Sequence, residues 1–176
     1  MKEVGLIDKI SFNLMAAEYK IKSIFSPPEE ILKQTNIQPG DHVVDYGCGP
    51  GRFTIPLAQM VGNKGKVFAV DINPIAFEKV KNKAKTENLE NVEYIDGHNI
   101  KMIEKESIDV VILYDTLHDL NDMRGTVKSI SGMLKTGGYL SFKDHTLKKQ
   151  CIKEMTANLP LNLERENEKT IEFKKV

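Results

Sequence analysis

The sequence predicts an α/β fold in which helices cover both faces of a doubly wound, mostly parallel sheet. Short runs rich in Val and Ile alternate along the chain with turns and with stretches of helical periodicity. The run at 108–114 is almost continuously apolar, as expected of a parallel strand that is covered on both faces. Near the end of the chain, the segments 161–165 and 170–174 alternate apolar and polar residues instead, which predicts a β-hairpin.

The pattern predicts a sheet of seven strands. The turn at 38–41 introduces the first strand, and the pair Gly137-Gly138 introduces the fifth. Five strands should pair in parallel and the hairpin should close one edge, so that one strand runs antiparallel in a three-layer, Rossmann-like architecture. The five parallel strands are expected at 42–46, 66–71, 92–96, 108–114 and 139–143.

Helical patterns occupy the stretches between these strands. Asn73 is a suitable N-cap for a helix that begins with Pro74, and Asn121 is a suitable N-cap for a helix that follows the fourth strand. Residues 1–26, which precede the sheet, also carry apolar side chains at helical spacing. The stripes expected to face inward are Ala76, Val80 and Ala84, then Met123, Val127, Ile130 and Leu134, and at the N-terminus Phe12, Met15 and Tyr19.

Length and charge restrict the classes of protein. A chain of 176 residues with 40% hydrophobic side chains suits a single domain, expected to span 1–176. The 25 Lys and Arg residues balance the 25 Asp and Glu residues, so neither nucleic acid nor a membrane is expected as a partner. The first residues lack a secretory pattern, which predicts a cytoplasmic protein, and we expect a monomer or homodimer. Cys48 and Cys151 lack metal-ligand spacing and are expected to be free thiols.

The clearest functional motif is the glycine-rich turn after the first strand, Asp45-Tyr-Gly47-Cys-Gly49-Pro-Gly51. Its glycines permit a sharp turn and let a ligand approach the free N–H groups at the start of a helix. Asp71 follows at the end of the second strand, where a carboxylate can accept hydrogen bonds from ribose hydroxyls. Together they predict a nucleotide-like ligand.

The spacing of the glycines argues against two common nucleotide sites. In the dinucleotide pattern G-x-G-x-x-G, counted from Gly47, the last small residue would be Arg52, which is too large for close helix–strand packing. A P-loop would need a Lys followed by Ser or Thr after the glycines, and none is present. A nicotinamide-dependent oxidoreductase therefore stays only as an alternative.

The combined motifs resemble those of class I S-adenosylmethionine-dependent methyltransferases, especially small microbial enzymes that act on low-molecular-weight substrates. The run 43–51 resembles the first motif of that family, and Val70-Asp71 resembles its acidic end of strand two. Asp96-Gly97 resembles the position that contacts adenine, and 134–140 resembles the family's entry into strand five. The resemblance covers residues 27–176 in order and spacing.

The resemblance implies S-adenosylmethionine as the cofactor and a small-molecule methyl acceptor. Glycines of the turn would line the methionine and ribose parts, Asp71 would hold the ribose, and Asp96 would accept from the adenine amine. In similar enzymes a segment such as 1–26 lies as a helical cap over the site, although here it could equally be a helix that packs on the core. The residues implied to bind the cofactor are Asp45, Gly47, Cys48, Gly49, Gly51, Asp71, Ile72, Asp96, Gly97 and Tyr114.

Methyl transfer from a sulfonium is an in-line displacement, so positioning supplies most of the catalysis. A general base is needed only for an acceptor that binds protonated, and the candidates are Asp115, His118 and His145. Both histidines could instead be ordinary loop residues. Asp115, Asp144 and His145 could also gather Mg²⁺, as carboxylates at these strand ends do in some catechol-type methyltransferases, which this family includes. The rest of that subfamily's pattern is not evident in this sequence, so no metal is expected. A non-catalytic cofactor-binding module that works with a partner stays open as a further alternative.

Overall fold

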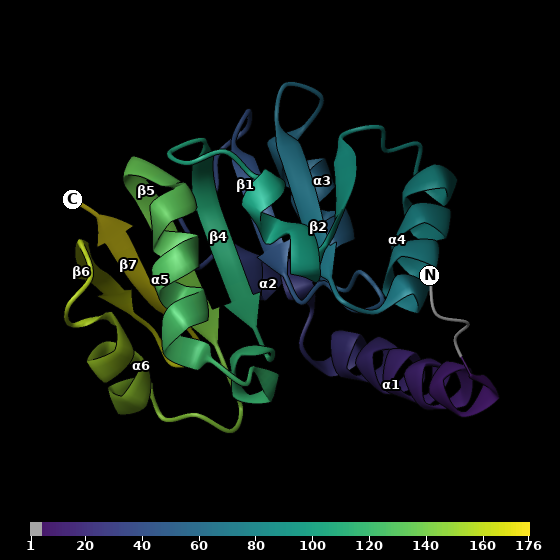
Figure 1. Cartoon of the computed structure of the whole chain (residues 1–176). Coiled ribbons are helices and arrows are strands. Elements are labelled where there is room, and N and C mark those ends of the chain that lie inside the picture. The colour runs from purple at the N-terminus through teal and green to yellow at the C-terminus, as the bar shows by residue number, and fades with distance from the viewer. Residues whose placement is uncertain (1–4) are drawn as a thin grey trace.

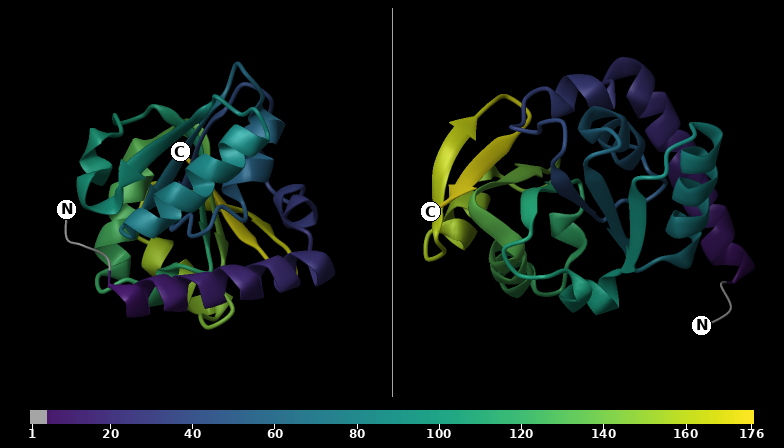
Figure 2. Two further views of the ribbon diagram at one scale, coloured as in Figure 1. Left: turned by 90° about the vertical axis from the view of Figure 1, so that its right-hand side faces the viewer. Right: turned by 90° about the horizontal axis from the view of Figure 1, so that it is seen from above.

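A computed structural model describes residues 5–176 and contains a seven-stranded mixed sheet between two layers of helices (Figure 1, Figure 2). The strand order is β3-β2-β1-β4-β5-β7-β6, so the order reverses between β1 and β4. This arrangement confirms the predicted α/β class. The strands are β1 (His42–Tyr46), β2 (Lys66–Asp71), β3 (Val92–Asp96), β4 (Ile108–Tyr114), β5 (Leu134–Lys143), β6 (Leu161–Glu166) and β7 (Ile171–Lys175).

Strand direction also agrees with the prediction. Strands β1 to β5 pair in parallel, and β7 runs antiparallel to both of its neighbours, β5 and β6. Strand β5 begins at Leu134, five residues before the predicted start, because Leu134 pairs with Ile108 across a bulge before Tyr139 pairs with Val110. The assignment of Leu134 to a helical stripe was therefore wrong, although its side chain is fully buried.

The described residues also form six α-helices and two short 3₁₀-helices, η1 and η2. Asn73 caps α4 as predicted, and its side-chain oxygen accepts from the N–H of Ile75 at 3.0 Å. The cap of α5 is Asp122 and not Asn121, because the Asp122 carboxylate reaches the N–H of Gly125 at 2.9 Å. The helices are α1 (Leu6–Phe25), α2 (Pro28–Leu32), α3 (Thr54–Val61), α4 (Pro74–Thr86), η1 (Gly97–Met102), η2 (Leu117–Asp119), α5 (Met123–Met133) and α6 (Lys149–Thr156).

The core lies on both faces of the central strand β4. Val110 and Ile112 pack in one cluster with side chains of α2 and α3. Val111 and Leu113 point the other way and pack with side chains of α5 and α6. Alternate residues of a strand face opposite sides of the sheet, so an unbroken apolar run is what a strand covered on both faces requires.

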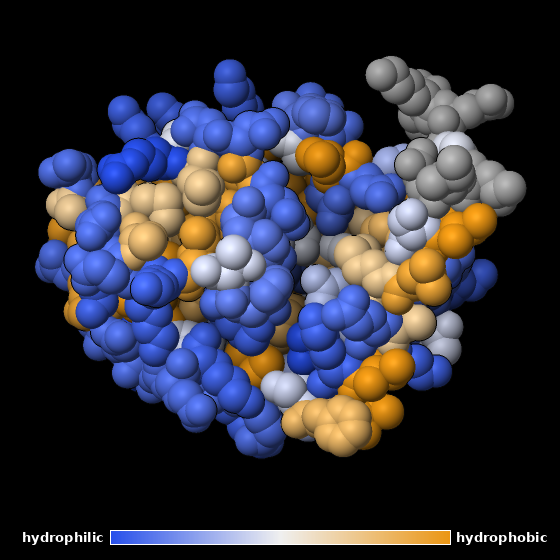
Figure 3. Space-filling model, turned by 90° about the horizontal axis from the view of Figure 1, so that it is seen from below, coloured by the Kyte–Doolittle hydropathy of each residue, from blue (hydrophilic) through white to orange (hydrophobic). Residues whose placement is uncertain are grey.

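Helix α1 crosses the edge of the sheet at which the parallel strands end (Figure 1, Figure 2). Phe12 on its inner side is buried in a cluster with Cys48 and Ile75. Residues 1–4 of the predicted cap lie outside the described residues. The outer side of α1 exposes large apolar residues along its length (Figure 3), namely Ile10, Leu14, Ile21, Ile24 and Phe25. Of the helices in 5–176, none has both the length and the apolar character of a membrane span.

Candidate active site

A cavity of about 1330 Å³ lies between the carboxyl ends of the parallel strands and the inner side of α1. Its wall combines the glycine-rich turn, the ends of β2 and β3, the loop after β4, and Phe12, Met15 and Tyr19 of α1. Pockets for one small ligand usually measure about 300–1,000 Å³, so this cavity has room for two reactants. All of the predicted cofactor-binding residues line it except Asp45 and Gly51.

The three glycines of the turn have different roles. All have positive φ, at 78° for Gly47, 49° for Gly49 and 78° for Gly51. A Cβ at Gly47 would collide with the side chain of Thr116, and one at Gly51 would lie 2.9 Å from a methyl group of Val80. A Cβ at Gly49 would meet no atom within 4 Å. Neighbouring side chains therefore leave no room for a Cβ at Gly47 and Gly51. At Gly49 the missing side chain leaves open space beside the cavity.

Asp71 ties this turn to the end of β2. One carboxylate oxygen accepts from the N–H of Gly49 at 2.9 Å, and the other accepts from the N–H of Asn73 at 2.8 Å. Burial raises the pKa of Asp71 although these backbone hydrogen bonds favour the carboxylate. Each carboxylate oxygen can accept more than one hydrogen bond, so Asp71 can still accept from hydroxyls of a ligand in the cavity.

An apolar surface beside a carboxylate continues the cavity past Asp71. Ile72 is 68% exposed, although it is a large aliphatic residue, and it lines the cavity. Gly97 lies against it, since a Cβ there would come within 2.9 Å of an Ile72 methyl group. Asp96 accepts from the N–H of His98 at 2.9 Å and keeps its carboxylate exposed. This combination suits a flat ring that carries an N–H donor at its edge.

Two predicted residues support the site from within the core. Asp45 is 2% exposed, and its carboxylate accepts from the hydroxyl of Thr54 at 2.6 Å at the start of α3. Burial raises the pKa of Asp45 to about 7. Tyr114 is buried with its ring edge-to-face on Phe53 and its hydroxyl 2.9 Å from that of Ser141. Burial also raises the pKa of Tyr114.

Asp115 occupies a strained position at the end of β4. Its φ is 54°, which is unusual for a residue with a side chain, and it lines the cavity. Its carboxylate lies 2.5 Å from the ammonium of Lys143 and 3.2 Å from Nδ1 of His145. Burial alone would raise the pKa of Asp115, but hydrogen bonds and charge from Lys143 and His145 outweigh that effect and lower it.

The two candidate histidines lie side by side next to Asp115. Their rings meet edge-to-face with centroids 4.9 Å apart. His118 Nδ1 lies 2.9 Å from the carboxylate of Asp144, and this hydrogen bond raises the pKa of His118. Neither histidine lines the cavity itself. The structure thus brings the three predicted catalytic residues together, with Asp115 between the cavity and the pair of rings.

A possible cation site forms from a different set than the one predicted. His118, Asp144 and His145 each offer a ligand atom, and these atoms lie within 4.8 Å of one another, whereas Asp115 is not in the group. Asp144 already accepts from His118 and from the N–H groups of Thr146 and Leu147. A cation at this cluster would compete with these donors for the oxygens of Asp144.

Two residues of the site were not identified from the sequence, namely Lys143 and Arg52. Lys143 pairs with Asp115 because Tyr114 and Lys143 are partners in the β4–β5 register. Arg52 entered the sequence argument only as a misfit to the dinucleotide pattern, yet it lines the cavity. A basic residue directly after the glycine-rich turn was the available clue.

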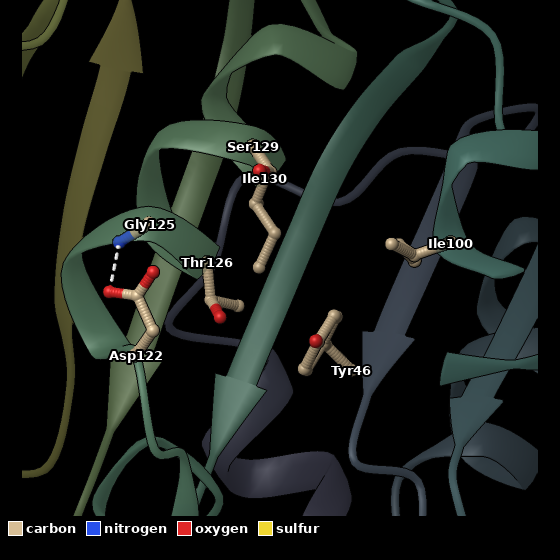
Figure 4. A pocket seen from close by; sticks show the side chains of 7 residues that line it. All are labelled: Tyr46, Ile100, Asp122, Gly125, Thr126, Ser129 and Ile130. Atoms are coloured by element: carbon tan, nitrogen blue, oxygen red, sulfur yellow. Dashed lines mark hydrogen bonds between the residues drawn. The ribbon is translucent and has the colours of Figure 1, made fainter. Parts of the chain in front are cut away.

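A smaller hollow lies between α5 and η1 (Figure 4). Its volume is about 260 Å³, and its one charged side chain, Asp122, already caps α5. Its lining residues are Tyr46, Ile100, Asp122, Gly125, Thr126, Ser129 and Ile130.

Comparisons with known proteins agree with this geometry. A protein family described as "Methyltransferase domain" matches residues 37–174. The demethylmenaquinone methyltransferase of Lactococcus lactis is 31% identical over 135 residues, which are 72% of this chain and 54% of the relative. That of Staphylococcus saprophyticus is 28% identical over 113 residues, which are 64% of this chain and 48% of the relative. The chain thus spans about half the length of these relatives.

Solved structures show the same fold. A SAM-dependent methyltransferase from Aquifex aeolicus superposes with a TM-score of 0.78 at 22% identity, covering 89% of this chain and 97% of the other. A SAM-dependent O-methyltransferase from Thermotoga maritima gives 0.67 at 20% identity, covering 85% and 64%. With the family match over most of its length, the chain belongs to the methyltransferase domain family of S-adenosylmethionine-dependent enzymes.

Proposed function

We propose that this protein transfers the methyl group of S-adenosylmethionine to a small-molecule acceptor. One observation carries the proposal. A single cavity joins a glycine-rich turn held by Asp71 to a charged network around Asp115, and it is large enough for a cofactor and an acceptor together. The family match and the named relatives, which act on a small molecule, support the same reading.

The cavity wall fits the parts of S-adenosylmethionine in sequence. Ile72 and Asp96 would hold the adenine, with the apolar side chain on the ring face and the carboxylate at the amine. Asp71 would hold the ribose hydroxyls. Gly49, which has open space where a Cβ would be, would let the methionine part approach the backbone. Asp45 would act indirectly, because it is buried under the turn and bonded to Thr54.

The chemistry at the other end of the cavity follows from its fixed charges. When bound, S-adenosylmethionine supplies an activated methyl group that a nucleophile can displace. Asp115 would accept a hydrogen bond from an O–H or N–H of the acceptor, because Lys143 and His145 keep it ionised. His118 and His145 would take up the proton, and Asp144 fixes the orientation of the His118 ring. The helix α1 would exclude water from the reacting atoms.

Calorimetry with S-adenosylhomocysteine, the demethylated product, provides the first test. We expect one site per chain and no heat with NAD. Binding of NAD in place of S-adenosylhomocysteine would favour the oxidoreductase alternative. A screen of metabolites with cofactor labelled in the methyl group then tests transfer. Tight binding of the product without transfer to any metabolite would favour a cofactor-binding module.

A further inference from the structure

Arg52 is held rigidly in the wall of the cavity. Its guanidinium lies between two aromatic rings, 5.0 Å from the centroid of Phe53 and 5.9 Å from that of Tyr19. Its Nη2 donates to the carbonyl oxygen of Ser26 at 2.7 Å. Contacts with the turn between α1 and α2 and with two rings thus fix both the position and the plane of the cation.

Among the side chains that the structure describes, no carboxylate forms an ion pair with Arg52. Its Nε is buried without a hydrogen-bond partner, and Nη1 has none among the described hydrogen bonds. Burial lowers the pKa of the guanidinium, although an arginine stays protonated. A partly buried cation without a counter-ion is costly, and an anionic ligand would relieve that cost.

The carboxylate whose charge acts on Arg52 is already paired with other cations. Asp115 acts on Arg52 through its charge and lines the same cavity. Its carboxylate, however, is bound by Lys143 and His145. Arg52 is therefore a partly buried cation of this wall that pairs with no carboxylate among the described side chains, at the end of the cavity formed by Tyr114 and Asp115.

We infer that Arg52, clamped between Tyr19 and Phe53, is a carboxylate-binding subsite of the cavity. The carboxylate belongs either to the methionine part of the cofactor or to the acceptor, and the inference rests on the proposed function. Nη1 of Arg52, which has no partner among the described hydrogen bonds, donates to the carboxylate, and the aromatic clamp sets its direction. Lysine would keep the charge but lose both the clamp and the fork of donors.

The test compares Arg52→Met and Arg52→Lys with the wild-type chain by calorimetry. The probes are S-adenosylhomocysteine and methylthioadenosine, which shares the adenosine but lacks the carboxylate. A cofactor subsite predicts that Arg52→Met binds S-adenosylhomocysteine at least tenfold more weakly and methylthioadenosine unchanged. Arg52→Lys should recover only part of the loss. Arg124→Met removes an exposed arginine of α5 and should change neither affinity.

An acceptor subsite predicts a different outcome. Both nucleosides should then bind Arg52→Met normally, while benzoate should bind the wild-type chain loaded with S-adenosylhomocysteine and bind Arg52→Met at least tenfold more weakly. Benzamide, which lacks the charge, should not distinguish the two proteins. The inference is overturned if Arg52→Met leaves S-adenosylhomocysteine binding unchanged and no benzoate binding depends on Arg52.

Two further measurements keep these outcomes interpretable. If Arg52→Met does not fold, Tyr19→Leu removes one face of the clamp without touching the charge, and it should weaken the same probe that Arg52→Lys weakens. An equal effect of Tyr19→Leu on methylthioadenosine would contradict the inference. Binding of methylthioadenosine by the wild-type chain supports the adenosine site independently, so the subsite can fail while the proposed function stands.

Discussion

The hydrogen bonds of Asp71 make a quantitative test of the cofactor site possible. The substitution Asp71→Asn keeps the shape of the side chain but leaves one acceptor oxygen in place of two. The N–H groups of Gly49 and Asn73 each bind a different oxygen of Asp71. One of these two donors must therefore lose its acceptor and face an amide NH₂ group.

The expected loss of affinity follows from the bonds at stake. Hydrogen bonds to a charged group contribute about 1.5–3 kcal/mol, and a ribose bound by the ionised Asp71 would lose that stabilisation. Since about 1.4 kcal/mol corresponds to a factor of ten, S-adenosylhomocysteine should bind at least about tenfold more weakly. The unsatisfied backbone donor should also lower the free energy of unfolding by about 1–3 kcal/mol.

Calorimetry and thermal denaturation separate the two effects when a matched control is included. Asp41 lies in the turn before β1, at the opposite edge of the sheet, and accepts from the N–H of Gln38 at 2.7 Å. Asp41→Asn keeps one oxygen for this single N–H donor, so it should cost little stability and leave the affinity unchanged. If Asp71→Asn bound S-adenosylhomocysteine as tightly as the wild-type chain, the ribose would not be held by Asp71 and the assignment of the cavity would be wrong.

Three further predictions concern the histidine pair and the glycine-rich turn. His118→Gln should lower the rate of methyl transfer and leave S-adenosylhomocysteine affinity unchanged; equal losses would remove its role in proton transfer. Asp144→Asn should lower the pKa of His118 in an NMR titration. The folded state raises the pKa of His118 and lowers that of Asp144, so the pair stabilises the fold most between the usual pKa of Asp, about 3.9, and that of His, about 6.5. The stability lost in Asp144→Asn should therefore fade as the pH rises through the folded pKa of His118. A loss of stability that is independent of pH would contradict this linkage. Gly47→Ala should destabilise the fold by more than the roughly 1–2 kcal/mol expected from positive φ alone, because its Cβ meets Thr116, whereas Gly49→Ala should fold with only that cost and lose cofactor affinity.

Local patterns were sufficient for most of the fold. The predicted ranges 42–46, 66–71, 92–96 and 108–114 agree with the observed strands, because each apolar run is bounded by a turn that the neighbouring residues specify. The beginning of β5 was missed, since the pairing of Leu134 depends on Ile108 and on the bulge between them. Adjacent residues that can both cap a helix, as at the start of α5, are not distinguished by propensity.

The sequence alone was enough to predict a nucleotide-like ligand, because the glycine-rich turn and the acidic residue one strand later form a local pattern with a fixed spacing. Only the tertiary structure decided which charges are satisfied. Whether Lys143 neutralises Asp115 depends on the register of two strands, and whether Arg52 is left without an anion depends on how α1 packs over the cavity. Charged residues that are far apart along the chain become ion-pair partners only when the chain packs. A periodic pattern in the sequence does not predict which residues will pair.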